Sequence, residues 1–177
     1  MAALPKLTLV LGGAASGKSA FAEALCVASG QARTYIATAR IWDDEMAAKV
    51  ARHVAQRGDG WKTISAQTDL ASAIAGLSPA DVALVDCVTM WLTNLMMDGA
   101  DLDAAREEFD SALAASPAPM ILVSNDVGGG IVPDNALARR FQNEQGRLNQ
   151  HLVARAKLVV MVTAGLPMVL KGVLPDA

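Results

Sequence analysis

Short apolar runs alternate along the chain with segments in which apolar residues recur every three or four positions. Nearly unbroken apolar runs are typical of parallel strands covered on both faces, and the helical spacing between them is typical of crossover helices. We expect strands at 7–11, 33–37, 61–64, 81–86, 120–124, 157–163 and 167–171, and helices at 18–29, 43–57, 69–76, 88–97, 102–115 and from Asp134 onward. The alternation predicts an α/β domain, with a mostly parallel central sheet and helices on both faces.

Local signals support several of these boundaries. Gly30 ends the first predicted helix, and three acidic residues from Asp43 to Glu45 begin the next one, where they suit the positive end of the helix dipole. The long helix from Asp134 carries apolar residues along one face: Leu137, Phe141, Leu148 and Leu152. A chain of 177 residues without a linker or repeat predicts one domain spanning 1–177.

A glycine-rich stretch follows the first predicted strand and precedes the first predicted helix. It fits the phosphate-loop pattern of Gly, four residues, Gly, Lys and Ser or Thr. Gly12 and Gly17 allow successive N–H groups to converge on phosphate oxygens, Lys18 adds a positive charge, and Ser19 offers a hydroxyl to Mg²⁺. The predicted phosphate-binding residues are Gly12, Gly13, Ala14, Ala15, Ser16, Gly17, Lys18 and Ser19. This pattern identifies a nucleoside triphosphate site without identifying the base.

Asp86 ends the predicted strand at 81–86, where phosphate-loop enzymes place the acid that holds the Mg²⁺ shell. An alternative is that Asp86 caps the next helix. We favour the metal role and predict that Ser19 and Asp86 bind Mg²⁺ together.

Composition and charge limit the classes of function that fit this sequence. The formal net charge is −3 and no run of Lys and Arg occurs, which argues against nucleic acid as the main partner. The apolar run at 7–11 is too short for a signal peptide, and the stretch from 158 to 170 is interrupted by polar residues and proline, so neither predicts a membrane span. We interpret Cys26 and Cys87 as buried thiols in a reducing compartment and expect a cytoplasmic protein.

His53 lies on the predicted helix at 43–57 and shares a face with Met46 and Val50. Spacing alone favours a hydrogen-bonded histidine on a partly buried face. The functional alternative is a nucleophile, because a neutral imidazole can attack phosphorus and form a P–N bond. The other histidine, His151, stands among polar residues near the end of the long helix, and we expect it to be solvated.

A set of motifs along nearly the whole chain is similar to one enzyme family. They include the phosphate loop, Tyr35-Ile36-Ala37-Thr38, His53-Val54-Ala55-Gln56-Arg57, Val85-Asp86-Cys87-Val88-Thr89, Trp91-Leu92-Thr93-Asn94-Leu95, Val123-Ser124-Asn125, Gly130-Ile131-Val132-Pro133, Asn149-Gln150 and Gly165-Leu166-Pro167. The sequence resembles the bifunctional adenosylcobinamide kinase / adenosylcobinamide-phosphate guanylyltransferases of cobalamin biosynthesis. The His53 helix and the Gly-Ile-Val-Pro block are more selective than the phosphate loop.

The resemblance implies a RecA-like P-loop NTPase fold, an oligomer that we expect to be a trimer, and two reactions. Adenosylcobinamide is phosphorylated with ATP or GTP, and GMP then passes from GTP through His53 to adenosylcobinamide phosphate, with Mg²⁺ required in both steps. His53 and Lys18 are the implied catalytic residues. The resemblance also implies nucleotide contacts at Ala37, Thr38, Ala39, Val54, Ala55, Gln56, Arg57, Ser65 and Asp86.

Three positions depart from the family pattern. The family often has Arg where Ala15 stands, usually Glu where Ser65 stands, and often Glu where Asp126 stands. Serine keeps a hydrogen bond but loses a negative charge at a position that the resemblance places on the nucleotide. Two other functions stay open: a RecA-type ATPase or switch without a covalent intermediate, and an enzyme with the kinase activity alone.

Overall fold

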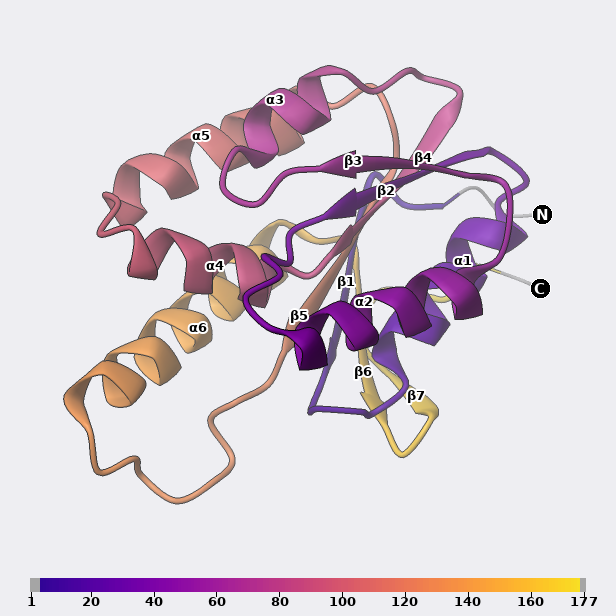
Figure 1. Ribbon diagram of the computed structural model, residues 1–177. Coiled ribbons are helices and arrows are strands. Elements are labelled where there is room, and N and C mark those ends of the chain that lie inside the picture. The colour runs from indigo at the N-terminus through magenta and orange to yellow at the C-terminus, as the bar shows by residue number, and fades with distance from the viewer. Residues whose placement is uncertain (1–3, 176–177) are drawn as a thin grey trace.

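The computed structural model describes residues 4–175 and contains one seven-stranded sheet (Figure 1). The strand order is β3-β2-β4-β5-β1-β6-β7, and every neighbouring pair is parallel except β6 with β7. The strands are β1 (Leu7–Gly12), β2 (Ala32–Ala37), β3 (Trp61–Ser65), β4 (Asp81–Asp86), β5 (Met120–Asn125), β6 (Leu158–Thr163) and β7 (Leu166–Lys171). All seven predicted strands are confirmed within one residue at each end.

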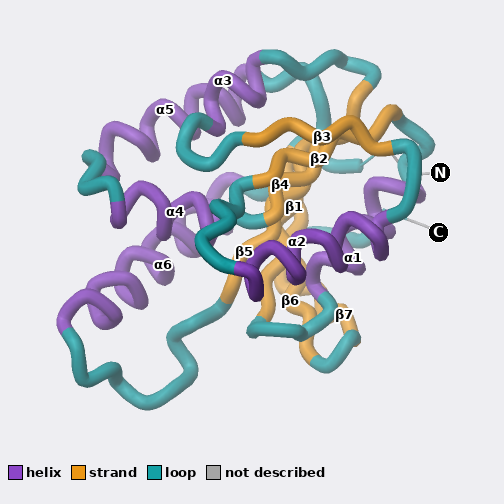
Figure 2. The backbone as a smooth tube through the Cα atoms, viewed as in Figure 1, coloured by secondary structure: helices purple, strands orange, loops and turns teal. Residues whose placement is uncertain are grey.

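Within residues 4–175, six helices connect the strands, and Figure 2 shows them on both sides of the sheet. They are α1 (Lys18–Ala28), α2 (Asp44–Arg57), α3 (Leu70–Ala75), α4 (Val88–Met97), α5 (Leu102–Ala115) and α6 (Ala136–Arg155). Side chains of Asp43, Asp69, Asp101 and Asn135 accept backbone N–H groups at the starts of four of them. These caps satisfy helix donors that have no partner within the helix.

The two faces of the sheet carry separate apolar cores. Ala22 and Cys26 of α1 pack on one face with Val10, Leu84 and Val160. On the other face, a larger cluster joins the sheet to α3, α4, α5 and α6 through Ile74, Trp91, Phe109, Leu148 and Leu152. Because strands β1, β4 and β5 are covered on both faces, their burial is almost complete, and the predicted α/β architecture is confirmed.

Two details of the predicted long helix are wrong. It begins at Ala136, because the side chain of Asn135, and not Asp134, caps it by accepting the N–H of Ala138. Leu137 is 57% exposed and does not share the buried face of Leu148 and Leu152. Figure 1 shows that the first turn of α6 lies away from the sheet, so helical spacing alone does not bury a residue there.

Both cysteines are buried and free, as expected. Within residues 4–175, none of the helices is long and apolar enough to cross a membrane.

Candidate active site

The phosphate loop connects β1 to α1 and is shaped by close backbone contacts. A Cβ at Gly12 would lie 2.6 Å from the carbonyl oxygen of Val162, so no larger residue fits there. Gly17 has φ = +93°, which favours glycine, and Ala15 also has a positive φ of 54°. The loop is held by the N–H of Asp126, which donates to the carbonyl of Gly12. The loop therefore leads from β1 directly into the N-terminus of α1, where backbone N–H groups can bind phosphate.

Lys18 begins α1 and is almost buried. Its Nζ donates to the carbonyl oxygen of Gly13 at 3.0 Å. The ammonium group therefore lies inside the loop that would surround the phosphates. Ser19 follows it in the first turn of α1 and is half-buried.

Strand register brings three predicted site residues into one row. Ala37 of β2 pairs with Ser65 of β3 on one side and with Asp86 of β4 on the other. All three end their strands at the carboxyl edge of the sheet, where ligands bind in α/β folds. Since neighbouring strands are about 4.8 Å apart, Ser65 and Asp86 lie about 10 Å apart across this edge. The phosphate loop leaves the same edge from β1, with β5 between β1 and β4.

Asp86 is half-buried, and its Oδ2 accepts a hydrogen bond from the hydroxyl of Tyr35 at 3.1 Å. Glu23 lies one turn after Ser19 on α1. Burial raises the pKa of Glu23 and the charge of Asp86 raises it further, while Arg57 opposes the shift. Thus Asp86, Glu23 and Arg57 lie near one another on the α1 face. Tyr35 and Glu23 were not predicted as site residues, because only the fold brings them to Asp86.

The residues at this edge fit a magnesium site of the phosphate-loop type. Mg²⁺ prefers oxygen ligands and usually takes one or two from the protein, with the rest from phosphates and water. Ser19 and Asp86 supply a hydroxyl and a carboxylate. Within residues 4–175, no group of three or more His, Cys, Asp or Glu side chains is placed to hold a metal ion.

A buried asparagine holds the loops that follow β2 and β3. Asn94 of α4 donates to the carbonyl oxygen of Thr38 at 2.8 Å and to that of Gln67 at 2.7 Å. The hydroxyl of Thr38 donates to the carbonyl of Cys87 and accepts its N–H. Thr38 is therefore fixed to both β4 and α4, and its neighbour Ala39 is half-buried. Thr38 and Ala39, two predicted nucleotide contacts, therefore lie on a backbone segment that hydrogen bonds hold in place.

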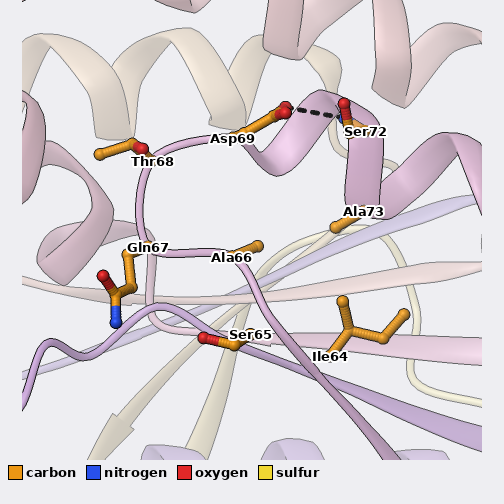
Figure 3. A pocket seen from close by; sticks show the side chains of 8 residues that line it. All are labelled: Ile64, Ser65, Ala66, Gln67, Thr68, Asp69, Ser72 and Ala73. Atoms are coloured by element: carbon orange, nitrogen blue, oxygen red, sulfur yellow. Dashed lines mark hydrogen bonds between the residues drawn. The ribbon is translucent and has the colours of Figure 1, made fainter.

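A pocket of about 520 Å³ opens beside the end of β3 (Figure 3). Ser65 lies at the end of β3 and lines this pocket. At the start of α3, the N–H of Ser72 donates to the carboxylate of Asp69 at 2.9 Å. Its lining residues are Ile64, Ser65, Ala66, Gln67, Thr68, Asp69, Ser72 and Ala73. The predicted contact residue Ser65 is thus exposed at a hollow of the surface.

The helix that carries His53 is the least buried helix next to the site. His53 is half-buried, whereas Val54 and Ala55 are exposed. The side chain of Gln56 lies outside the described part of the structure. Arg57 points back to the sheet, where its guanidinium lies over the ring of Tyr35.

A polar network supports the end of β5, next to the phosphate loop. Gln145 of α6 is fully buried and donates to Ser124 and to Asn149, and Asn149 donates to the carbonyl of Asn125. The N–H of Asn125 in turn donates to the hydroxyl of Thr89. The motifs around Asn125 and Asn149 therefore meet in space.

His151 is not solvated as expected. Its Nε2 lies 2.7 Å from Oδ2 of Asp110, which also accepts from Arg155 at 2.7 Å. The side chain is only 30% exposed, because α5 packs beside α6 at this point. His151 joins an ion-pair cluster between two helices, on the face of the sheet opposite α1.

The sequence was compared with known families and proteins. The family model described as "Cobinamide kinase / cobinamide phosphate guanyltransferase" matches residues 8–170. A protein of Pseudomonas aeruginosa, the bifunctional adenosylcobalamin biosynthesis protein CobP, is 45% identical over 93% of this chain and 96% of its own. The bifunctional adenosylcobalamin biosynthesis protein CobU of Escherichia coli is 42% identical over 93% of this chain and 99% of its own.

Similar structures extend the fold comparison. The flagellar accessory protein FlaH from Methanocaldococcus jannaschii has a TM-score of 0.52 at 13% identity, covering 96% of this chain and 80% of FlaH. An ATPase from a bacterial type III secretion system has a TM-score of 0.54 at 13% identity, covering 90% of this chain and 52% of the ATPase. At these identities the likeness concerns the fold alone, and it confirms the predicted RecA-like P-loop class.

Proposed function

Because this chain belongs to the cobinamide kinase / cobinamide phosphate guanyltransferase family, we propose that it phosphorylates adenosylcobinamide and then attaches GMP through His53. The family match over residues 8–170 carries the two activities: the protein is a bifunctional cobinamide kinase and cobinamide phosphate guanylyltransferase. The histidine intermediate and the residue roles below are our proposals.

In the kinase step, the phosphate loop binds the triphosphate of ATP or GTP. The hydroxyl oxygen of adenosylcobinamide attacks the γ-phosphorus, the bond from that phosphorus to the β-phosphate oxygen breaks, and the nucleoside diphosphate leaves. The hydroxyl proton passes to solvent. Lys18 and the loop N–H groups stabilise negative charge on the transferred phosphoryl group. For this, the Nζ of Lys18 must exchange the Gly13 carbonyl for phosphate oxygens.

In the guanylyl step, a ring nitrogen of His53 attacks the α-phosphorus of GTP and pyrophosphate leaves. The resulting P–N bond holds GMP, and the other ring nitrogen releases its proton. A phosphate oxygen of adenosylcobinamide phosphate then attacks the same phosphorus, the P–N bond breaks, and the ring regains its proton. The product is adenosylcobinamide-GDP. One difficult transfer is thereby divided into two easier ones.

Ser19 and Asp86 would hold Mg²⁺ with the triphosphate. The ion supplies positive charge that offsets the phosphates in both steps. Tyr35 keeps the carboxylate of Asp86 oriented. Ala37, Thr38, Ala39 and Ser65 lie along the same edge and are proposed to contact the nucleotide, as are Val54, Ala55, Gln56 and Arg57 on α2.

The two alternatives leave particular residues without a role. A RecA-type ATPase or switch would need the phosphate loop and Asp86, but not His53 or the Gly-Ile-Val-Pro block. An enzyme with kinase activity alone would also leave His53 unused. Both alternatives predict that no GMP remains bound to the denatured protein.

We also propose a cytoplasmic homo-oligomer, a trimer by resemblance, that acts on ATP, GTP and corrinoids and does not bind nucleic acid. Strand β7 supports the oligomer because it forms the sheet edge and exposes Leu166, Met168 and Leu170. An edge strand with exposed apolar residues is suited to association. Light scattering of the purified protein tests this, and a monomer at micromolar concentration would contradict it.

Mass spectrometry after mixing the protein with GTP and Mg²⁺ tests the intermediate. We expect a mass increase equal to bound GMP, mapped to the peptide with His53. The adduct should be labile in acid and stable in base, as P–N bonds to imidazole are. His151→Ala is the matched control, since His151 lies in the ion-pair cluster with Asp110, and it should retain the adduct. An adduct at a lysine, or none, would overturn the proposal.

A further inference from the structure

The last residue of helix α2 contacts two strands of the sheet. None of its described side chains is fully buried, and Figure 1 shows the helix in front of the sheet, with the chain leaving its end toward β3. Arg57 ends the helix. The Cζ atom of Arg57 lies 3.6 Å from the centre of the Tyr35 ring, and its Nη2 donates to the hydroxyl of Thr63 at 3.2 Å. Arg57 therefore fixes the end of α2 against β2 and β3.

Tyr35 also contacts Asp86, whose carboxylate is proposed to bind Mg²⁺. The ring is 8% exposed and packs edge-on against Trp61, with ring centres 6.2 Å apart. Its hydroxyl donates to Oδ2 of Asp86. Burial and the charge of Asp86 raise the pKa of Tyr35, so the hydroxyl keeps its proton and remains a donor. One carboxylate oxygen of Asp86 is thus engaged, and the orientation of the other is set.

His53 is four residues before Arg57, so both residues lie on one face of α2, about 6 Å apart along the axis. Whatever holds Arg57 also sets where the turn with His53 stands relative to the sheet. The contacts from Arg57 to Tyr35 and from Tyr35 to Asp86 form an unbroken connection between the His53 helix and the carboxylate.

We propose that Arg57 and Tyr35 are positioning residues that connect the His53 helix to Asp86, and so keep the histidine in register with the bound triphosphate. This inference rests on the proposed function of His53 and Asp86. In addition to the nucleotide contact proposed for Arg57, it gives Arg57 and Tyr35 a role in guanylyl transfer that acts through His53 and Asp86.

The positive charge of Arg57 acts on a nearby carboxyl group, in addition to the packing of its side chain on Tyr35. Arg57 lies close enough to Glu23 to oppose the rise in the pKa of that carboxyl, and Asp86 acts on the same carboxyl in the opposite direction. An apolar side chain of similar length would still cover the Tyr35 ring. It would lose the cation–π attraction and remove a positive charge from the vicinity of Glu23.

Two variants separate the two contacts. Tyr35→Phe keeps the ring under Arg57 and removes the hydrogen bond to Asp86. Arg57→Met keeps most of the side-chain length and removes the charge. Arg33→Met is the matched control, because Arg33 lies over the neighbouring Trp61 ring at 5.4 Å and donates to the carbonyl of Asp59.

Three measurements on the full-length protein test the connection. They are the Mg²⁺ concentration that gives half-maximal binding of a non-hydrolysable GTP analogue, the rate of GMP attachment at saturating GTP, and amide hydrogen exchange across α2. Tyr35→Phe should raise the Mg²⁺ concentration about 3- to 10-fold, the range expected for a typical hydrogen bond, because the variant changes the orientation of Asp86 and removes no ligand of the ion. Arg57→Met should slow GMP attachment about 10-fold or more, slow the kinase step less, and speed exchange in the last turn of α2. Arg33→Met should match the wild type in all three.

The outcomes distinguish this inference from the proposed function. If the wild type attaches GMP at His53 and both variants match it in attachment rate, Mg²⁺ dependence and exchange, the positioning role is wrong and the function stands. If the wild type attaches no GMP, the function of His53 is wrong, and unchanged Mg²⁺ dependence and exchange would reject the connection as well. Should Arg57→Met fail to fold, Arg57→Lys tests the same point. It keeps the charge, and we expect it to attach GMP faster than Arg57→Gln.

Discussion

The ammonium nitrogen of Lys18 lies 3.0 Å from the carbonyl oxygen of Gly13, five residues earlier in the same loop. The lysine is 9% exposed, so its charge is already partly removed from water. The charge therefore lies inside the loop before the nucleotide binds, and it reaches phosphate oxygens by exchanging the Gly13 carbonyl for them, which places it for electrostatic stabilisation of the transferred group.

Lys18→Ala should therefore abolish both half-reactions, since both need the bound triphosphate. Losing one charge-assisted contact costs about 1.5–3 kcal/mol, or about 10- to 150-fold in nucleotide affinity, before any effect on the transition state. Calorimetric titration with GTP and separate assays of the two steps measure this. Lys62→Ala, on the exposed side of β3, is the control. Near-normal activity in either assay would mean that this loop is not the working site.

Asp86→Asn should raise the Mg²⁺ concentration needed for nucleotide binding by on the order of tenfold, because a neutral amide binds Mg²⁺ more weakly than a carboxylate. The fold should persist, since the amide oxygen still accepts the hydrogen bond from Tyr35. Circular dichroism checks the fold and a Mg²⁺ titration checks the function. Asp59→Asn, in the turn before β3, is the control. Loss of the fold without a metal effect would identify Asp86 as a structural residue.

His53→Ala should stop guanylyl transfer and preserve much of the kinase step, because only the former needs a nucleophile on the protein. Alanine favours helix and the side chain is only half-buried, so α2 should persist. Parallel assays with adenosylcobinamide and with its phosphate separate the two steps. Equal loss of both activities would point to a structural role for His53.

Asn94→Ala should destabilise the protein by about 1–3 kcal/mol, because it leaves the buried carbonyls of Thr38 and Gln67 without their donor. Nucleotide affinity should fall as well, since Thr38 begins the loop on which Ala39 stands. Urea denaturation and GTP titration measure the two effects. Asn143→Ala, exposed on α6, should change neither quantity. Unchanged affinity in a destabilised variant would confine Asn94 to the core.

The two thiols should resist labelling in the folded protein. Burial raises the pKa of Cys26 to about 12 and that of Cys87 to about 11, above the ordinary value of 9.0. Between pH 9 and 11 the unfolded chain releases thiol protons that the folded chain retains, so the free energy of unfolding should fall as pH rises through this range. Labelling with a thiol reagent at pH 8 should require unfolding. Rapid reaction of either thiol in native buffer would contradict the burial.

The sequence by itself determined the elements and the chemistry of the phosphate loop. Apolar runs defined strands such as 81–86, because a strand covered on both faces has no polar side. Gly12 to Ser19 identified the nucleotide site because their geometry is local: strand, tight turn and helix N-terminus are consecutive in the chain. The caps of α2 and α3 could be predicted for the same reason, whereas the start of α6 depended on which of two adjacent polar side chains accepts the N–H of Ala138.

Only the tertiary structure decided which distant residues meet. Strand order placed β2 beside β4, and this brought the hydroxyl of Tyr35 to Asp86, 51 residues later. The packing of α5 on α6 took His151 out of solvent by pairing it with Asp110. Such contacts depend on register and helix packing between segments far apart in the chain, and no local pattern records them. The contact of Arg57 with Tyr35 could not be predicted for the same physical reason. The sequence around an arginine at a helix end does not indicate which side chain the arginine will contact.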